Sequence, residues 1–75
     1  MSIPMSSLEP GKTGRILELM NLGSLRQRLL DLGLVPGTSV ERLMNSPIGD
    51  PVCFRIRGAM IALRMEDADQ IRVAI

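Results

Sequence analysis

The clearest pattern of hydrophobic and polar positions lies between Ser24 and Gly37, in the run S-L-R-Q-R-L-L-D-L-G-L-V-P-G. Leu25, Leu29 and Leu32 recur at i, i+4 and i+7, and most positions between them carry charged or amide side chains. This spacing puts the three leucines on one side of a helix and the polar residues on the other. The pattern therefore predicts a short amphipathic helix with one buried face.

Both ends of this helix carry residues that satisfy free backbone groups. Ser24 and Gln27 have the spacing of a capping box, in which each side chain bonds a backbone amide of the first turn. Gly33 supplies the left-handed residue of a Schellman ending, and Leu34 follows where its side chain can fold back onto Leu29. We expect a helix that begins at Ser24 and ends before Gly33.

Five other segments have the alternation or the apolar content of a strand, namely 15–20, 39–45, 52–57, 60–63 and 71–75. The third is the clearest, because Val52, Phe54 and Ile56 alternate with residues that suit an outer face. The first does not alternate cleanly, and a β-bulge beside Leu17 would restore its pattern.

The connections between these strands are too short for the crossovers that parallel strands require. Gly58 and Ala59 are expected to turn the chain into a hairpin, and residues 66–68 fit a single helical turn with acidic side chains at its N-terminal end. Short antiparallel strands protect their edges by curling into an SH3-like or OB-like barrel.

The fold prediction is accordingly a mainly β protein with one domain over residues 1–75. We expect a small SH3-like antiparallel barrel of about five strands. One short α-helix is inserted after the first long strand, and a single helical turn precedes the last strand.

The amino-acid composition then limits the classes of function that the chain can have. Although 45% of the residues are hydrophobic, Phe54 is the single aromatic, so the core must be aliphatic and there is no platform for stacking bases. Nine basic residues are offset by eight acidic ones, and a net charge of +1 produces only a weak long-range field. These features weigh against binding to nucleic acid.

The chain has no histidine, the residue that most often transfers protons near neutral pH and binds metals. The serines and Cys53 therefore have no imidazole to activate them. Glu66, Asp67 and Asp69 cluster in one short segment, which is expected to be a solvated acidic turn. We expect a protein that is not an enzyme.

Cys53 is the only soft metal ligand of any strength, and it is a weak candidate. On its predicted strand it shares a face with Arg55 and Arg57, which would repel a cation. A second protomer could supply a partner thiol or carboxylate. The six methionines show no short repeat, and we expect them to fill gaps in the core.

The single cysteine excludes an intramolecular disulfide, and residues 1–7 have neither the basic start nor the apolar run of a signal peptide. No apolar stretch approaches the ~20 residues that cross a bilayer. We expect a cytoplasmic protein without direct membrane insertion.

Two features remain as anchors for a protein partner. One is the helix end that contains Leu34, and the other is the loop that carries Ile48 between a proline and a glycine. Together with Arg26 and Arg28 on the helix, these residues are the predicted partner contacts. The alternative for Leu34 is that it only closes the helix end.

An ordered set of motifs resembles the FeoA family of small ferrous-iron-transport accessory proteins. The set reads L-E-P-G-K-T-G-R-I, L-R-Q-R-L-L-D-L-G-L-V-P-G, S-P-I-G-D-P, G-A-M-I-A-L-R and I-R-V, and it covers the chain from Leu8 to Val73. The resemblance implies an SH3-like barrel, in agreement with the strand pattern. It also implies that the matching positions Leu29, Gly33, Leu34, Pro36, Gly37, Gly49, Asp50, Pro51, Leu63 and Arg64 are mostly architectural.

The resemblance further implies a cytosolic accessory protein that docks on FeoB, the membrane protein with a GTPase domain that imports Fe(II). The alternative is a transition-metal-binding module, in which Fe(II) or Zn(II) bridges Cys53 or carboxylates of two chains and holds a homodimer together. No cofactor is expected beyond such weak metal binding.

Overall fold

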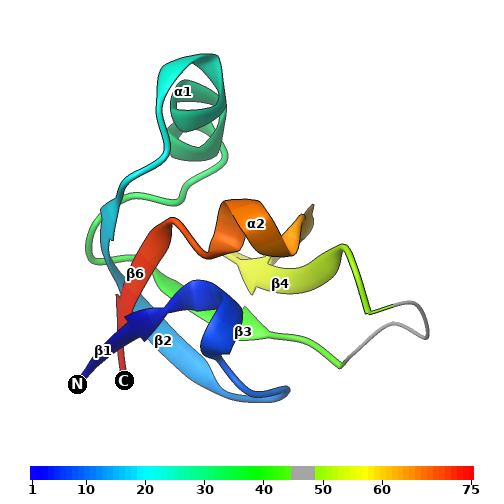
Figure 1. Ribbon diagram of the computed structural model, residues 1–75. Helices are drawn as coiled ribbons and strands as arrows, with labels where there is room; N and C mark the ends of the chain where they lie inside the picture. Colours follow the sequence, from blue (N-terminus) through cyan, green and yellow to red (C-terminus); the bar gives the residue numbers. More distant parts are fainter. Residues whose placement is uncertain (45–48) are drawn as a thin grey trace.

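One antiparallel β-sheet organises the protein in the computed structural model, which describes residues 1–44 and 49–75 (Figure 1). Its elements are β1 (Ser2–Pro4), the 3-10 helix η1 (Met5–Ser7), β2 (Thr13–Leu19), α1 (Gly23–Asp31), β3 (Ser39–Arg42), β4 (Val52–Ile56), β5 (Ala59–Leu63), α2 (Met65–Ala68) and β6 (Ile71–Ala74). The strands are ordered β1-β6-β2-β3-β4-β5, and every neighbouring pair is antiparallel. The predicted fold class is confirmed, with α1 after the first long strand and α2 before the last.

Strand β1 is an addition that the sequence did not predict. Ser2, Ile3 and Pro4 pair with Ala74, Val73 and Arg72 of β6, so the two ends of the chain lie side by side (Figure 1). Three residues are too few to show a period of two, and this strand depends on the edge that β6 offers.

The predicted bulge in β2 is confirmed. The register between β2 and β6 shifts between Ile16 and Glu18, and Leu17 is 43% exposed between them. Ile16 and Leu19 consequently both face the core, although they are three positions apart and would face opposite sides of a regular strand. The bulge increases the local twist that a curled sheet needs.

The core is aliphatic around Phe54, as expected, but the methionines do not fill it. Met5 is fully buried and Met65 is half-buried, whereas Met1, Met20, Met44 and Met60 are 89%, 46%, 80% and 70% exposed. The prediction of gap-filling methionines is therefore wrong for most of them. Leu, Ile and Val on the inner faces of the strands already occupy the space, and these four methionines fall at chain ends or outer positions.

Arg42 is a charged residue inside this core, with 8% of its surface exposed. One guanidinium nitrogen, Nη1, donates to the carbonyl of Ser6 at 3.1 Å and also to the carbonyl of Leu8. The Arg42 backbone in turn bonds the turn before β2, through Gly11 N at 2.7 Å and Lys12 O at 2.9 Å. Arg42 thus fastens the N-terminal segment onto β3.

Helix α1 ends as predicted but begins differently. At its C-terminal end Gly33 has φ 106°, Leu34 N donates to Leu29 O at 3.1 Å, and Gly33 N donates to Leu30 O at 3.0 Å. These are the two bonds of a Schellman ending.

The capping-box prediction at the N-terminal end of α1 is wrong. The helix starts at Gly23, and the residue in the capping position is Leu22, whose side chain makes no capping bond. Gln27 Nε2 instead donates to Asp31 Oδ1 at 2.9 Å, one helical turn further along. An i,i+4 bond on the helix surface therefore replaces the reciprocal bond of a capping box.

The β4–β5 hairpin turns one residue earlier than predicted. Its two loop residues are Arg57 and Gly58, with φ of 50° and 81°, and Ile56 pairs with Ala59 across the turn. Two positive φ values are the signature of a type I′ turn, whose twist matches that of the flanking strands. The hairpin itself is confirmed.

Candidate docking surface

Helix α1 stands away from the sheet at one end of the molecule (Figure 1). It is attached by Leu29, which is 1% exposed, and by Leu25 and Leu30, which pack against the core while partly exposed. Leu32 belongs to the predicted buried stripe but is 44% exposed, because it is the C-cap residue where the chain leaves the helix. In the described ranges, no helix is long and apolar enough to cross a membrane.

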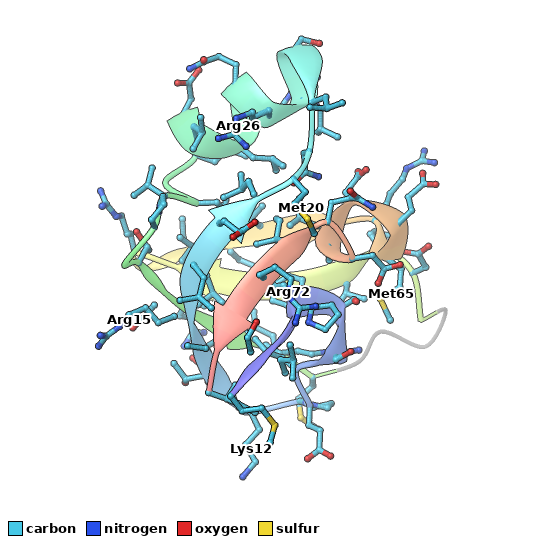
Figure 2. The ribbon with its side chains drawn as sticks, turned by 60° about the vertical axis from the view of Figure 1, so that its left-hand side comes forward. Lys12, Arg15, Met20, Arg26, Met65 and Arg72 are labelled. Atoms are coloured by element: carbon cyan, nitrogen blue, oxygen red, sulfur yellow. The ribbon has the colours of Figure 1, made fainter. Side chains whose placement is uncertain are left out.

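The two predicted arginines of α1 have different surroundings. The Arg26 guanidinium donates to the carbonyl of Leu19 at the end of β2, so this side chain braces the helix against the sheet (Figure 2). Arg28 lies in the last turn and is exposed, and its guanidinium makes no hydrogen bond or ion pair with any residue of 1–44 or 49–75. Arg28 is therefore the more available cation for a partner.

Leu34 does not lie on the surface as a partner contact would. Its side chain is 0% exposed and belongs to the hydrophobic core. The Schellman ending turns the residue after Gly33 inward, which is the alternative role considered for it. The other predicted anchor, Ile48, lies outside the described residues.

The exposed apolar residues beside α1 were not predicted. Met20 and Leu22, in the link from β2 to α1, are 46% and 83% exposed, and Leu32 adds an apolar surface at the other end of the helix. Figure 2 shows Met20 where the chain leaves β2 toward the helix. The sequence did contain one signal for Leu22, because it lies three positions before Leu25 and so extends the leucine spacing of the helix by one step.

A groove of about 500 Å³ adjoins the C-terminal end of α1. It is lined by Val35, Pro36, Gly37, Thr38, Ser39 and Arg57. The Arg57 side chain also lies against Gly33, where an added Cβ would come within 3.4 Å of Arg57 Cδ. The helix end and the hairpin turn therefore form one continuous surface with an exposed cation.

Three acidic residues around α2 accept hydrogen bonds, Asp50 and Asp69 through their carboxylates and Asp67 through its backbone carbonyl. Ser6 Oγ donates to Asp69 Oδ1, and the Asn21 amide nitrogen donates to the Asp67 carbonyl at 3.1 Å. Asp50 Oδ1 accepts a bond of 3.0 Å from the backbone nitrogen of Met65, so it caps α2 from another loop. These contacts agree with an acidic, helix-starting turn.

Cys53 is half-buried on the outer face of β4, opposite Ala62 of β5. The neighbouring outward residue Arg55 is exposed and lies 3.7 Å from Glu41. Within the described ranges, no three His, Cys, Asp or Glu side chains come together in a group that could hold a metal ion. Any metal bound through Cys53 would need ligands from outside this part of the chain.

Comparison with known proteins identifies relatives of this chain in sequence and in structure. The profile of the FeoA domain family matches residues 3–75. A curated relative, the Fe(2+) transport protein A/Fe(2+) transporter FeoB fusion protein of Porphyromonas gingivalis, is 34% identical over 71 residues. The match covers 95% of this chain and only 8% of the relative's length.

Solved structures show the same fold. The solution structure of iron(II) transport protein A from Clostridium thermocellum is 37% identical, with a TM-score of 0.90 over 97% of this chain and 45% of that one. A Stenotrophomonas maltophilia FeoA, crystallised with zinc and described as a prokaryotic SH3 domain protein, is 25% identical, with a TM-score of 0.81 over 97% and 88% of the two chains. The SH3-like architecture is thus confirmed.

Proposed function

Since this chain belongs to the FeoA family, we propose that it is a non-enzymatic accessory protein of ferrous iron uptake, which docks on a FeoB-type transporter at the cytoplasmic side of the membrane. The observation that carries the proposal is the Porphyromonas gingivalis relative, in which a region that matches 95% of this chain is fused to a FeoB transporter. Fusion holds two partners at a high effective concentration. We propose that a docking surface on this chain makes the corresponding contact with the transporter.

The proposed docking surface consists of Met20, Leu22, Arg28 and Leu32, which we call the α1 surface. Its three apolar side chains are 46%, 83% and 44% exposed, and Arg28 is a cation without a partner in the described part of the chain. Protein interfaces commonly place apolar anchors at their centre and charges at the rim. The proposal that the protein acts by binding is also supported by the absence of histidine from its sequence.

The test is recovery of the transporter from detergent-solubilised membranes by the tagged protein. Leu22→Asp is expected to reduce recovery at least tenfold, because a carboxylate would replace the most exposed apolar side chain of the surface. Arg28→Glu reverses the free charge and is expected to reduce recovery several-fold. Both side chains are exposed, so neither change is expected to unfold the protein. Leu22 is the N-cap residue of α1, and an aspartate at this position is expected to raise the free energy of unfolding by about 1 kcal/mol.

Two matched variants serve as controls. Arg15→Glu makes the same charge reversal on β2, away from α1 (Figure 2), and Ile75→Asp makes the same apolar-to-acidic change at a C-terminal residue that is 60% exposed. Both are expected to recover the transporter normally. Full recovery with Leu22→Asp and Arg28→Glu would exclude the α1 surface, and no recovery with the wild type would exclude docking itself.

A second candidate function is a metal-binding module that dimerises through a bridging ion. The zinc complex of the Stenotrophomonas maltophilia relative favours it. In this chain the bridge would join the half-buried Cys53 thiolates, or carboxylates, of two protomers.

Sedimentation velocity distinguishes the two candidates. The metal-binding module predicts that Zn(II) converts the wild type from monomer to dimer, and that Cys53→Ser lowers the dimer fraction at the same zinc concentration. Ala62→Ser, on the residue opposite Cys53, is the matched control and is expected to dimerise like the wild type. An unchanged sedimentation coefficient of the wild type in zinc would contradict this candidate.

A further inference from the structure

Strand β5 is one edge of the sheet, and it differs from most edge strands. Its five residues, Ala-Met-Ile-Ala-Leu, carry no charge and no proline, and the strand has regular pairing with β4 from end to end. Natural sheets usually protect an edge with charges, prolines, bulges or a covering segment, because unpaired backbone groups recruit other strands. None of the first three protections is present in β5.

The hairpin register shows which backbone groups face outward. Ile56 and Ala59 flank a two-residue turn and form a hydrogen-bonded pair, so the alternation of an antiparallel ladder makes Cys53–Ala62 a non-bonded pair, and Arg55–Met60 another. The carbonyl of Cys53 supports this assignment, because it accepts from Leu43 N at 3.0 Å on the β3 side. The N–H and C=O groups of Met60 and Ala62 therefore point away from β4.

These outward groups are open to a partner. Outside the strand ladders, no backbone hydrogen bond within residues 1–44 and 49–75 involves the amides or carbonyls of Met60 or Ala62. Met60 is 70% exposed, and Ala62 beside it is exposed as well. We propose that β5 binds an extended segment of a partner protein as an additional strand, through the backbone groups of Met60 and Ala62.

Charge indicates the chemistry of that segment. Arg57 lies in the turn before β5, Arg64 follows directly after it, and neither guanidinium forms an ion pair within the described ranges. A segment with alternating apolar residues and an acidic residue at each end would match this arrangement. A second copy of the chain fits less well, because an antiparallel β5–β5 pair would bring Arg57 of one copy near Arg64 of the other.

This inference goes beyond the docking proposed for α1, since it rests on β5 and holds whether or not α1 contacts a transporter. The test uses the ¹⁵N-labelled full chain and two synthetic peptides, DEVTVTVED and KKVTVTVKK. The acidic peptide is expected to shift the Met60 and Ala62 amide resonances and to slow their hydrogen exchange. The lysine peptide is expected to bind at least tenfold more weakly.

Two variants and one modified peptide identify the mode of binding. Ala62→Pro removes an outward donor without removing a bond to β4, and it is expected to lower the affinity at least tenfold. Arg57→Asn suits the type I′ turn and removes one flanking cation, so it is expected to lower the affinity for DEVTVTVED several-fold while the fold persists. N-methylation of those alternate backbone amides of the acidic peptide that would face β5 removes its hydrogen-bond donors to the strand, and it is expected to abolish binding.

Several results would overturn the proposal. Equal binding of the acidic and lysine peptides would exclude charge recognition, and shifts confined to residues outside β5 would exclude this strand. Retained affinity in the N-methylated peptide and in both variants would exclude strand addition. Without any peptide, a sedimentation coefficient that rises with protein concentration, together with broadened β5 amide resonances, would show that a second copy rather than an acidic segment occupies the edge.

Discussion

Leu34→Asp is expected to leave no folded protein at 25 °C. The side chain is 0% exposed, so the change would place a carboxylate in an aliphatic core that offers it no partner. Leu34→Ala is expected to cost about 3 kcal/mol through lost burial and the cavity left behind. A small domain has only about 5–10 kcal/mol of stability to lose. Circular dichroism and urea denaturation measure both effects.

Leu32→Asp and Leu32→Ala are the matched controls, because Leu32 is two residues away and 44% exposed. They are expected to change the free energy of unfolding by less than about 1 kcal/mol. A folded Leu34→Asp protein with an unchanged urea midpoint would contradict the inward orientation of Leu34. In a binding study, loss of docking by a Leu34 variant would therefore report unfolding. Leu22 is exposed, so a Leu22 variant can report docking while the protein stays folded.

Arg42→Met is expected to destabilise the protein by about 2–4 kcal/mol, since two carbonyl groups near the core lose a charged donor. Those carbonyls belong to Ser6 and Leu8. The same segment contributes two core side chains, Met5 and Leu8, which are 0% and 2% exposed. Methionine keeps much of the length of the arginine stem, so the loss reports the hydrogen bonds more than the packing.

Urea denaturation measures the loss, and amide hydrogen exchange of residues 1–8 locates it. Exchange in this segment is expected to accelerate more than in β4, because Arg42 fastens the segment to β3. Arg15→Met is the matched control on an exposed arginine and is expected to change stability by less than about 0.5 kcal/mol. An Arg42→Met protein with wild-type stability and unchanged protection of residues 1–8 would show that the guanidinium is not what holds the segment.

The elements that could be predicted are those whose cause is local. The alternation of Val52, Phe54 and Ile56 specifies a strand with one buried face, and Gly33 specifies the end of a helix, whatever surrounds them. The bulge at Leu17 could also be inferred, because only an extra residue lets both Ile16 and Leu19 face inward. In each case the signal is a spacing that one backbone conformation satisfies.

The candidate site was predicted less completely, because exposure depends on what packs above each residue. Arg26 and Arg28 were placed on the helix surface, but only the structure shows that Arg26 is bonded to Leu19 and that Arg28 is free of described partners. Leu34 and Leu22 are equally apolar in the sequence, yet one is 0% and the other 83% exposed. Hydrophobicity alone does not separate a core residue from an anchor.

The amino-acid sequence by itself determined the class of fold, the helix end at Gly33 and the family, since these follow from short-range spacing and from an ordered set of motifs. Only the tertiary structure decided that β1 pairs with β6, that Arg42 is buried under the N-terminal segment, and that β5 is left as an uncharged edge. The first two features join residues far apart in the chain, and the third depends on the strand order of the whole sheet. The contacts that stabilise them are made with residues that the local periodicity of the sequence does not identify.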